Sequence, residues 1–445
     1  MTSTNRRDFL KYTGQTAAAV TVAVRCSTLA QNAEAKATSA NERPVVAVIG
    51  TGGMGTAHVR QLAANRDVRL AYLCDVDERR LDDATKTAET AGSSAPTKVK
   101  DLRRVLDDDA VDAVWIATPD HWHAPATILA CQAGKHVYVE KPCSHNLREG
   151  RLMVEAARRH QRVVQVGTQS RSTPHIQQAI ERLRAGAIGE VIVAKAWNSQ
   201  RRRSIGHAQP SDPPPQLDYD NWLGPAPMVP YQANLLPGVW RWWYAFGTGD
   251  MGNDGVHDID IGRWGLGVET HPSRIAALGS KSFFDDDQQF PDTQYVVFEY
   301  PGASATGRAK QFIFEQRIWS PYVQEGHENG NAFYGTEGML ILGKQSGWQL
   351  FGPKNKLVEE GRGSPDLAAH HRDFLDCIRE GGQPHAEIEI NHLSSALCHL
   401  GNIATRVGRV LQFDPATERV LHDDDAQRLL RRDYRDAHWA VPQGV

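Results

Sequence analysis

The sequence of 445 residues has few cysteines, no excess of basic charge and no long apolar run, and each absence excludes a class of protein. Its six cysteines lack the spacing of metal ligands, so we expect no bound metal and no obligatory disulfide framework. The formal net charge of −3 leaves no basic field to hold nucleic acid or an anionic membrane. No apolar segment is long enough for a stable transmembrane helix. The 40% hydrophobic and 23% charged residues are typical of a globular protein, and the length favours two domains.

Residues 1–40 are expected to be an export signal and linker rather than part of a folded domain. The run Asn5–Lys11 contains paired arginines and resembles a twin-arginine signal, and Thr16–Val24 is a weakly apolar stretch of signal-peptide length. Small residues at Ala33–Ala35 suit a signal peptidase, although Arg25 interrupts the apolar stretch early. The segment predicts an exported, periplasmic or extracytoplasmic protein. If the signal is not used, the same residues form a tail on a cytoplasmic protein.

A glycine-rich loop follows the first strongly apolar segment. Pro44–Ile49 reads as a strand buried on both faces, and Thr56–Ala64 has the apolar spacing of a helix. Between them stands Gly-x-Gly-x-x-Gly, formed by Gly50, Gly52 and Gly55. This order of strand, loop and helix is typical of dinucleotide-binding Rossmann folds. The first glycine permits a tight turn, the second lets a pyrophosphate approach the backbone, and the third allows the helix to pack closely on the strand.

Asp75 indicates which dinucleotide is bound. It follows a second apolar strand, Val68–Cys74, at the distance from the glycine loop where an acidic residue accepts hydrogen bonds from ribose hydroxyls. A carboxylate at this position repels a 2′-phosphate, so the sequence favours NAD over NADP. Arg79 and Arg80 are close enough in sequence to keep NADP as the less favoured alternative.

The alternation of strands and helices continues beyond this point. Val111–Ala117 is a predicted strand that runs into the turn Thr118–His123, and Ala124–Ala133 is a predicted helix. The next strand, His136–Val139, delivers the triplet Glu140-Lys141-Pro142. Both the turn and the triplet follow the carboxyl ends of strands, where open α/β sheets bind their ligands.

The Glu-Lys-Pro triplet, taken with the glycine loop and the Thr118-Pro119 turn, resembles the glucose–fructose oxidoreductase/inositol dehydrogenase/MocA (Gfo/Idh/MocA) family. The likeness extends through Val163–Gln169 to Gly401–Ala404. It implies an α/β protein with an NAD(P)-binding Rossmann domain over 44–168 and a C-terminal α+β domain over 169–445. In the family the second domain contains an open, mostly antiparallel sheet that often forms oligomer contacts. We therefore expect a homo-oligomer, a dimer or a tetramer.

The residue pattern changes after Gln169 in a way that agrees with such a second domain. A helix is predicted over Thr173–Ala185, and an amphipathic helix over Asp366–Arg379 is expected to serve mainly in packing. The pairing of the strands cannot be read from the pattern. The predicted strands are Val191–Trp197, Arg274–Leu278, Tyr295–Tyr300 and Gln311–Phe314.

The resemblance implies Lys141 and His257 as the catalytic residues, with His257 near the reacting carbon. The family usually has an aspartate four residues before this histidine, where the chain has Asn253, with Asp254 beside it. Either Asp254 substitutes as the acid–base partner, or Lys141 and His257 act without a carboxylate. At its unperturbed pKa of about 6.5, His257 would exchange a proton near neutral pH, while Lys141 polarises the substrate oxygen and donates or accepts its proton. A satisfied core histidine is the alternative interpretation of His257.

The remaining expected site residues form a substrate group and a cofactor group. The substrate group is Trp240, Arg241, Arg201 and His257, because apolar ring faces beside hydrogen-bond donors suit a sugar. The tryptophan can equally belong to the core or to an oligomer interface, and Arg201 can equally lie in a solvated loop. The residues expected to contact NAD are Gly50, Gly52, Met54, Gly55, Asp75, Thr118, Pro119, His121, His123, Glu140, Lys141 and Gln169.

These expectations favour an NAD(P)-dependent oxidoreductase that transfers hydride between the cofactor and a secondary alcohol of a sugar, glycoside or cyclitol. Relatives in the family use tightly bound NAD in a cycle of oxidation, elimination and reduction, so a glycosidase is the alternative. A third hypothesis is a protein that binds sugar without turnover. The presence of both Lys141 and His257 counts against that hypothesis.

Overall fold

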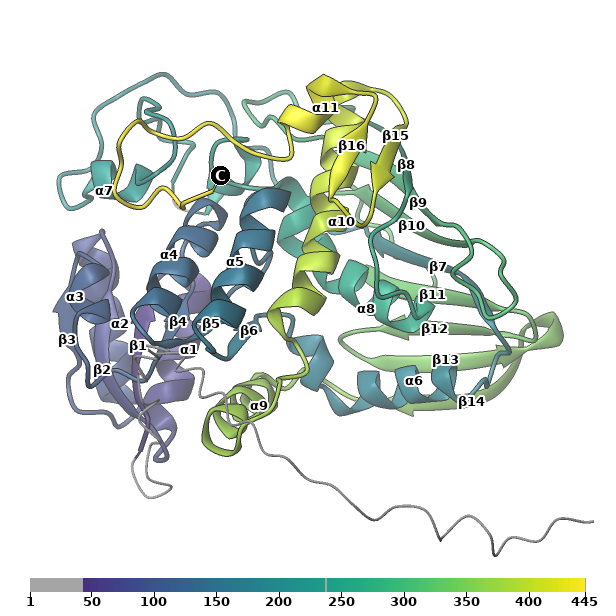
Figure 1. Ribbon diagram of the computed structural model, residues 1–445, viewed down its shortest axis with the longest axis horizontal. Coiled ribbons are helices and arrows are strands. Elements are labelled where there is room, and N and C mark those ends of the chain that lie inside the picture. Colours follow the sequence, from purple (N-terminus) through teal and green to yellow (C-terminus); the bar gives the residue numbers. More distant parts are fainter. Residues whose placement is uncertain (1–42, 237, 445) are drawn as a thin grey trace, which may run out of the picture. The chain divides into compact units, whose positions relative to one another are not determined.

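The computed structural model describes residues 43–236 and 238–444, so the export signal predicted at 1–40 lies outside the described residues. The described chain contains two sheets, one of six strands and one of ten (Figure 1). Within these ranges no helix combines the length and the apolar character needed to cross a bilayer. The five cysteines of the described chain, at positions 74, 131, 143, 377 and 398, are free thiols.

The first sheet is parallel and has the strand order β3-β2-β1-β4-β5-β6, which confirms the predicted Rossmann topology. The order reverses between β1 and β4, and doubly wound sheets bind their ligands outside the carboxyl ends of the strands at such a reversal. The strands are β1 (Val45–Ile49), β2 (Arg69–Cys74), β3 (Thr97–Val99), β4 (Ala113–Ile116), β5 (His136–Val139) and β6 (Val164–Val166).

Helices cover both faces of this parallel sheet, which explains why its strands are almost continuously apolar. In β1, Val46 and Val48 belong to the core on one face, and Ala47 and Ile49 belong to the core on the other. The first face is covered by α1 (Gly53–Ala64), α2 (Glu78–Thr90) and α9 (Leu367–Glu380), and the second by α3 (Arg103–Leu106), α4 (Asp120–Gln132) and α5 (Leu147–Arg159).

The second sheet has the order β14-β13-β12-β11-β7-β10-β9-β8-β15-β16 and is antiparallel except for the parallel pair β7 and β10. The predicted open, mostly antiparallel sheet is confirmed. Its strands are β7 (Val191–Asn198), β8 (Arg274–Ser280), β9 (Thr293–Tyr300), β10 (Lys310–Arg317), β11 (Asn329–Gly335), β12 (Met339–Gly343), β13 (Gly347–Gly352), β14 (Lys356–Arg362), β15 (Leu411–Asp414) and β16 (Arg419–Leu421).

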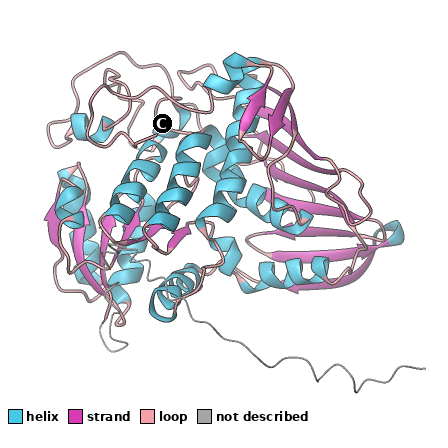
Figure 2. Cartoon of the chain, viewed as in Figure 1, coloured by secondary structure: helices cyan, strands magenta, loops and turns pink. Residues whose placement is uncertain are grey.

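One face of the second sheet packs against helices that lie between the two sheets (Figure 2). Alternate side chains of its strands point away from these helices, so Leu278 of β8 and Tyr295 of β9 are 77% and 41% exposed. The helix α10 also packs against α5, so it contacts both halves of the described chain. The covering helices are α6 (Pro174–Arg184), α8 (Val256–Leu266) and α10 (Ile388–Val407).

The tryptophan-rich connection between β7 and α8 forms a small apolar cluster of its own. It contains the short helix α7 (Tyr219–Leu223) and the 3₁₀ turn η2 (Val239–Trp242), and its buried centre includes Trp222 and Phe246. The C-terminal tail after α11 (Asp424–Arg428) returns to the Rossmann half, where Trp439 contacts the ring of Trp122.

Candidate active site

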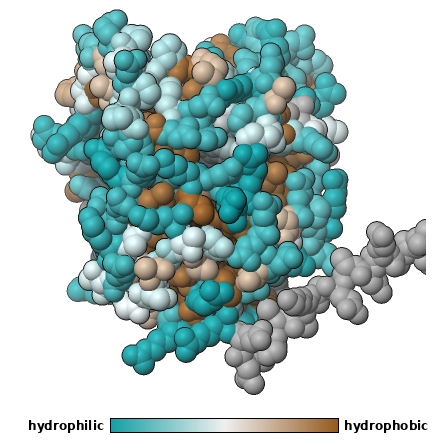
Figure 3. All heavy atoms as spheres, turned by 90° about the vertical axis from the view of Figure 1, so that its left-hand side faces the viewer, coloured by the Kyte–Doolittle hydropathy of each residue, from teal (hydrophilic) through white to brown (hydrophobic). Residues whose placement is uncertain are grey.

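A cavity of about 850 Å³ lies at the carboxyl edge of the parallel sheet. The glycine loop, the turn after β4, the triplet after β5, η2 and the start of α8 all contribute to its lining. Figure 3 shows the molecule from the side of the Rossmann half, where hydrophobic residues are visible near the centre of a mostly hydrophilic face. The elements that the sequence predicted to carry functional residues therefore meet around one cavity.

The glycine loop has the geometry that its motif predicts. Gly50 has a φ of +86°, and a Cβ atom there would lie 2.7 Å from the backbone of Ala117, the residue after β4. A Cβ atom on Gly55 would lie 1.9 Å from the carbonyl oxygen of Gly50, so only glycine lets α1 begin this close to β1. No side chain caps the start of α1 at Gly52, which leaves its first backbone N–H groups available to a phosphate. Gly52 and Met54 line the cavity, whereas Gly55 acts through packing.

Asp75 lines the cavity and also braces the glycine loop. Its Oδ2 accepts hydrogen bonds from the backbone N–H of Thr51 at 2.7 Å and from the Thr51 hydroxyl at 3.1 Å. Its Oδ1 accepts one from the backbone N–H of Asp77. A carboxylate has about four acceptor positions, so one remains for a ribose hydroxyl. Arg79 and Arg80 line the cavity beside it.

The turn after β4 divides its residues between the cavity and the protein interior. Thr118, Pro119, Asp120 and His123 line the cavity, and both ring nitrogens of His123 face carbonyl oxygens, those of Thr118 at 2.9 Å and of Pro142 at 2.7 Å. His121 does not line the cavity, contrary to expectation.

His121 lies outside the cavity lining because residues 120 to 132 form the helix α4. Residues three apart share a face of a helix, so Asp120 and His123 point to the cavity while His121 points elsewhere. The His121 ring is buried against Trp222, whose carbonyl oxygen lies 3.0 Å from its Nε2. Burial lowers the pKa of His121 to about 3, so the ring is neutral at physiological pH.

Glu140 and Lys141 lie at the end of β5 and line the cavity, as does Gln169. The Glu140 carboxylate accepts hydrogen bonds from Gln169 at 3.1 Å and from the buried His58 ring at 3.0 Å. Burial by itself would raise the pKa of Glu140, but the hydrogen bond to His58 and the charge of Lys141 lower it to about 2. His58 in turn lies 2.9 Å from His371 of α9, so α1 and α9, which cover the same face of the sheet, together hold this carboxylate.

The amine of Lys141 is 2.5 Å from the backbone carbonyl oxygen of Asn253. Asn253 belongs to a single π-helical turn, η3 (Met251–Gly255), which directly precedes α8. Such turns occur frequently at functional sites because they alter the regular helical hydrogen bonding. Burial lowers the pKa of Lys141, partly opposed by the charges of Glu140 and Asp120.

His257 lies one helical turn after Asn253 and lines the same cavity. Burial, together with the charges of Lys141 and Lys344, lowers the pKa of His257 to about 3. The expectation of a pKa near 6.5 is therefore wrong, because the ring is held half-buried beside cations. His257 is a neutral hydrogen-bonding group at physiological pH.

Asp254 does not take the place of the missing aspartate in the cavity lining. Its carboxylate accepts hydrogen bonds from Asn329 at 2.8 Å and Lys344 at 3.3 Å, behind the cavity. Although burial would raise the pKa of Asp254, Lys344 and His257 lower it. Of the two alternatives that the sequence left open, this geometry favours Lys141 and His257 acting without a carboxylate partner.

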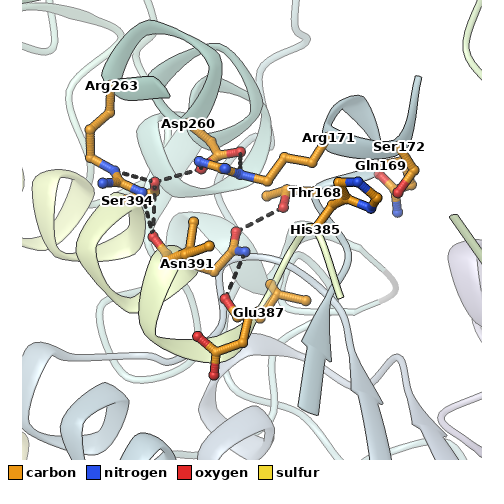
Figure 4. Close-up of polar contacts among 12 residues, drawn as sticks. Thr168, Gln169, Arg171, Ser172, Asp260, Arg263, His385, Glu387, Asn391 and Ser394 are labelled. Carbon is orange, nitrogen blue, oxygen red and sulfur yellow. Dashed lines mark hydrogen bonds and ion pairs between the residues drawn. The ribbon is translucent and has the colours of Figure 1, made fainter. Parts of the chain in front are cut away.

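A buried polar network fixes the helix that carries His257 (Figure 4). Arg171 of the turn after β6 forms a bidentate ion pair with Asp260 of α8 at 2.7 and 2.8 Å. The hydroxyl of Ser394 in α10 donates to Asp260 at 2.6 Å and accepts from Arg263 of α8 at 2.9 Å. Nearby, Thr168 donates to Asn391 of α10 at 2.8 Å. These bonds join the end of the Rossmann sheet, α8 and α10 at one place.

Some of the predicted substrate residues line the cavity and one does not. Trp240 and Arg241 line the cavity, whereas Arg201 is exposed and lies outside its lining. The next residue, Arg202, turns inward and forms an ion pair with the buried Asp250 at 2.9 Å. Within the basic run, Arg202 and not Arg201 is therefore the residue that contacts a buried carboxylate.

Several cavity-lining residues gave no motif in the sequence. Trp439 comes from the C-terminal tail, which contains no recognised motif. Asp120 belongs to the turn Thr118–His123, in which the sequence pattern pointed to the two histidines. Lys344 and His371 act behind the lining and are recognisable only once the fold brings their elements together. The unpredicted lining residues that carry polar or aromatic side chains include Asp120, Trp122, Lys100, Asp101, Asn221, Trp222, Tyr231 and Trp439.

Two family models match the chain. Residues 45–168 match the oxidoreductase family NAD-binding Rossmann fold, and residues 195–295 and 329–441 match the C-terminal alpha/beta domain of the same oxidoreductase family. The glycine loop, the uncapped start of α1 and Asp75 fit the dinucleotide that the first description names. The chain belongs to the Gfo/Idh/MocA family of oxidoreductases, as its motifs predicted, and it is an NAD-binding oxidoreductase.

Individual relatives agree with this assignment. An inositol 2-dehydrogenase of Rubrobacter xylanophilus is 30% identical over 69% of this chain and 73% of its own length. A scyllo-inositol 2-dehydrogenase (NAD⁺) of Bacillus subtilis is 25% identical over 76% of this chain and 87% of its own. Among solved structures, a levoglucosan dehydrogenase in complex with NADH and levoglucosan has the same fold, with a TM-score of 0.64, 20% identity, and coverage of 83% and 99% of the two chains.

Proposed function

We propose that the protein oxidises a secondary alcohol of a sugar, glycoside or cyclitol to a ketone, or performs the reverse reaction. The observation that carries this proposal is that Lys141 and His257 line the same cavity as the glycine loop and Asp75. NAD⁺, when bound, supplies the hydride acceptor. The inositol dehydrogenases among the relatives support a polyhydroxylated substrate.

Lys141 is the better of the two candidate bases. Its lowered pKa makes the neutral amine more accessible than in a free lysine, and Lys141 lines the cavity. His257, with a pKa of about 3, is a weak base but a good neutral hydrogen-bond partner. We therefore assign removal of the hydroxyl proton to Lys141 and orientation of that hydroxyl to His257. Asn253 holds the Lys141 amine through its carbonyl oxygen.

A glycosidase that uses bound NAD in an oxidation–elimination–reduction cycle is the second candidate. Glycosyl hydrolase family 109 proteins of Shewanella species support it at a distance. One from Shewanella pealeana is 32% identical over only 26% of this chain. The cavity suits either reaction, because both begin with the same removal of a hydroxyl proton and hydride.

The test begins with the cofactor. The purified protein is denatured and the released dinucleotide is identified, or NAD⁺ is titrated into the protein if none is released. The protein is then incubated with a panel of sugars, glycosides and cyclitols. Accumulation of NADH supports a dehydrogenase, and release of an aglycone without NADH supports the glycosidase. Absence of NAD or NADP binding by either method would overturn both.

Two further proposals concern assembly and location. We infer that the protein forms a homo-oligomer through the uncovered face of the ten-stranded sheet, supported by the exposure of Leu278 and Tyr295. We also propose export by the twin-arginine route on the basis of Asn5–Lys11. Expression of the full chain followed by separation of periplasm and cytoplasm tests the second proposal, with an Arg6→Lys, Arg7→Lys variant expected to remain in the cytoplasm.

A further inference from the structure

An arginine without a protein counter-ion stands in the cavity. Arg241 lies on η2 and lines the same cavity as Lys141 and His257. Its Nε atom is buried and has no hydrogen-bond partner, and its guanidinium takes part in no ion pair with residues 43–236 or 238–444. The guanidinium lies 5.5 Å from the ring centre of Trp240. Arginine stays charged in proteins, so a half-buried guanidinium without a partner costs free energy unless a ligand supplies one.

Each carboxylate around Arg241 accepts at least one hydrogen bond from another group. Both oxygens of Asp250 are hydrogen-bonded, Oδ2 to Asn198 at 2.7 Å and Oδ1 to Asn253 at 3.0 Å and to Arg202 at 2.9 Å. Asp120 accepts a hydrogen bond from Thr248 at 2.7 Å. Asp254 is bound by Asn329 and Lys344 behind the cavity. None of these groups pairs with Arg241, although their charges reach it.

Arg202 differs from Arg241 in having a carboxylate partner. It is the other inward-facing arginine of this region, and it forms an ion pair with Asp250. Arg241 therefore stands beside a cation that has already taken the buried carboxylate. It also shares the cavity lining with Lys141, whose pKa its charge helps to lower. An anion placed in the cavity near Arg241 would compensate both of these unfavourable interactions.

We propose that the substrate carries an anionic group, such as a sugar carboxylate or a phosphate ester, and that Arg241 binds it. This inference rests on the proposed oxidation of a sugar or cyclitol alcohol and narrows its substrate class. Guanidinium binds carboxylate and phosphate through parallel N–H donors, which fixes orientation as well as affinity. Trp240 beside it offers a ring face for the sugar carbons.

The test compares matched neutral and acidic sugars with the NAD-loaded protein. The pairs are glucose with glucuronate, galactose with galacturonate, and glucose with glucose 6-phosphate, which separates a carboxylate from a phosphate. Each is measured as kcat/KM by NADH formation and as Kd by calorimetry. Wild type is expected to prefer an acidic member by ~10- to 100-fold, the effect of a hydrogen bond to a charged group. Arg241→Met should abolish that preference, so that the acidic and the neutral member of each pair have equal kcat/KM and equal Kd.

Three controls accompany this comparison. Arg241→Lys should retain part of the preference, because it keeps the charge but loses the paired donors. Arg308→Met removes an exposed arginine on the loop before β10 and should change nothing. The affinity for NAD⁺ should be equal in wild type and Arg241→Met, which excludes a role in holding the cofactor.

The outcomes separate this inference from the proposed function. If no acidic sugar is preferred in any pair, or if Arg241→Met weakens both members of a pair equally, the anionic site is wrong. If NAD binds but no alcohol reduces it, the proposed oxidation fails. The calorimetric comparison still decides the anionic site by itself, since tighter binding of an acidic member that Arg241→Met removes supports it and equal binding overturns it.

Discussion

The side-chain amine of Lys141 is 2.5 Å from the backbone carbonyl oxygen of Asn253, a residue 112 positions further along the chain. This bond joins the end of a Rossmann strand to the π-helical turn before α8, so the two halves of the described chain meet at the group proposed to accept the substrate proton. The position that usually holds an aspartate in the family thus contributes a main-chain oxygen here. Its side chain donates instead to Asp250 at 3.0 Å.

Replacing Lys141 should stop turnover without unfolding the protein. Lys141→Met removes the proposed base, and a positioned acid–base group is worth ~10²–10⁴-fold in rate, so kcat should fall by that amount. Tm should remain near that of wild type, because the amine makes one hydrogen bond and the residue lines a cavity. A variant that keeps more than a tenth of the wild-type kcat would remove Lys141 from the proposed role.

The pH dependence of oxidation should report Lys141 and not His257. Because burial lowers the pKa of Lys141, the neutral amine becomes available below the usual lysine range, and kcat/KM should rise with pH through an apparent pKa below 10.5. His257, with a pKa of about 3, stays neutral throughout and should give no inflection near 6.5. His257→Gln should lower the rate while leaving the profile in place. An inflection near 6.5 that disappears in His257→Gln would show the opposite assignment.

The glycine loop allows a sharp comparison between two neighbouring glycines. A methyl group at position 55 would lie 1.9 Å from the carbonyl oxygen of Gly50, whereas a methyl group at position 53 meets nothing within 4 Å. Gly55→Ala should therefore reduce both Tm and NAD⁺ affinity, because α1 must move away from β1. Gly53→Ala should preserve Tm, since alanine is the better helix former at the start of α1. Equal unfolding temperatures for the two variants would argue against the close packing of this loop.

The local motifs of the Rossmann half could be predicted from the sequence because they depend on neighbouring residues. The strands β7 to β10 were also predicted within a few residues, since each is a continuous apolar or alternating segment. The strands after Asn329 were not predicted, because glycines interrupt them and they are stabilised by pairing with each other. Contacts between segments far apart in the chain could not be predicted from the sequence either. The His58–His371 contact joins residues 313 positions apart, and the partner of Lys141 is a main-chain atom.

Stability should decline as the pH falls from 6.5, before most carboxylates titrate. A group whose folded pKa is lowered binds its proton first in the unfolded state, so each such histidine favours unfolding progressively below about 6.5 and adds no stability change above it. Each can contribute up to ~1.4 kcal/mol per pH unit. Burial lowers the pKa to about 3 for His121, His257 and His399, and to about 4 for His136 and His370.

Urea unfolding at pH 7.5, 6.5 and 5.5 measures this effect. The free energy of unfolding should be nearly constant between the first two values and clearly lower at the third. Asp258, whose pKa burial raises to about 6, opposes the trend. Asp120 and His207 oppose it too, because burial raises the pKa of the first and the hydrogen bond to Asp287 raises that of the second. Equal stability at pH 6.5 and 5.5 would mean that these histidines are not held neutral in the folded protein.

Placing charged side chains on the uncovered face of the ten-stranded sheet should yield monomers if the proposed oligomer forms there. Leu278 and Tyr295 are directly opposite each other on β8 and β9, and both are exposed in the isolated chain. Contiguous exposed apolar surface on a sheet is unfavourable unless another surface covers it. The double variant Leu278→Asp, Tyr295→Lys places two charges of opposite sign there, which preserves the strand pair but prevents burial in an interface.

Light scattering coupled to gel filtration gives the mass of each species. Wild type is expected at a multiple of the chain mass and the double variant at the mass of one chain, with unchanged NAD⁺ affinity because the cavity lies elsewhere. Met228→Asp provides the matched control, since Met228 is 63% exposed on the tryptophan-rich connection and not on this sheet. If the double variant keeps the wild-type mass, or if Met228→Asp alone dissociates the assembly, the interface lies on another face.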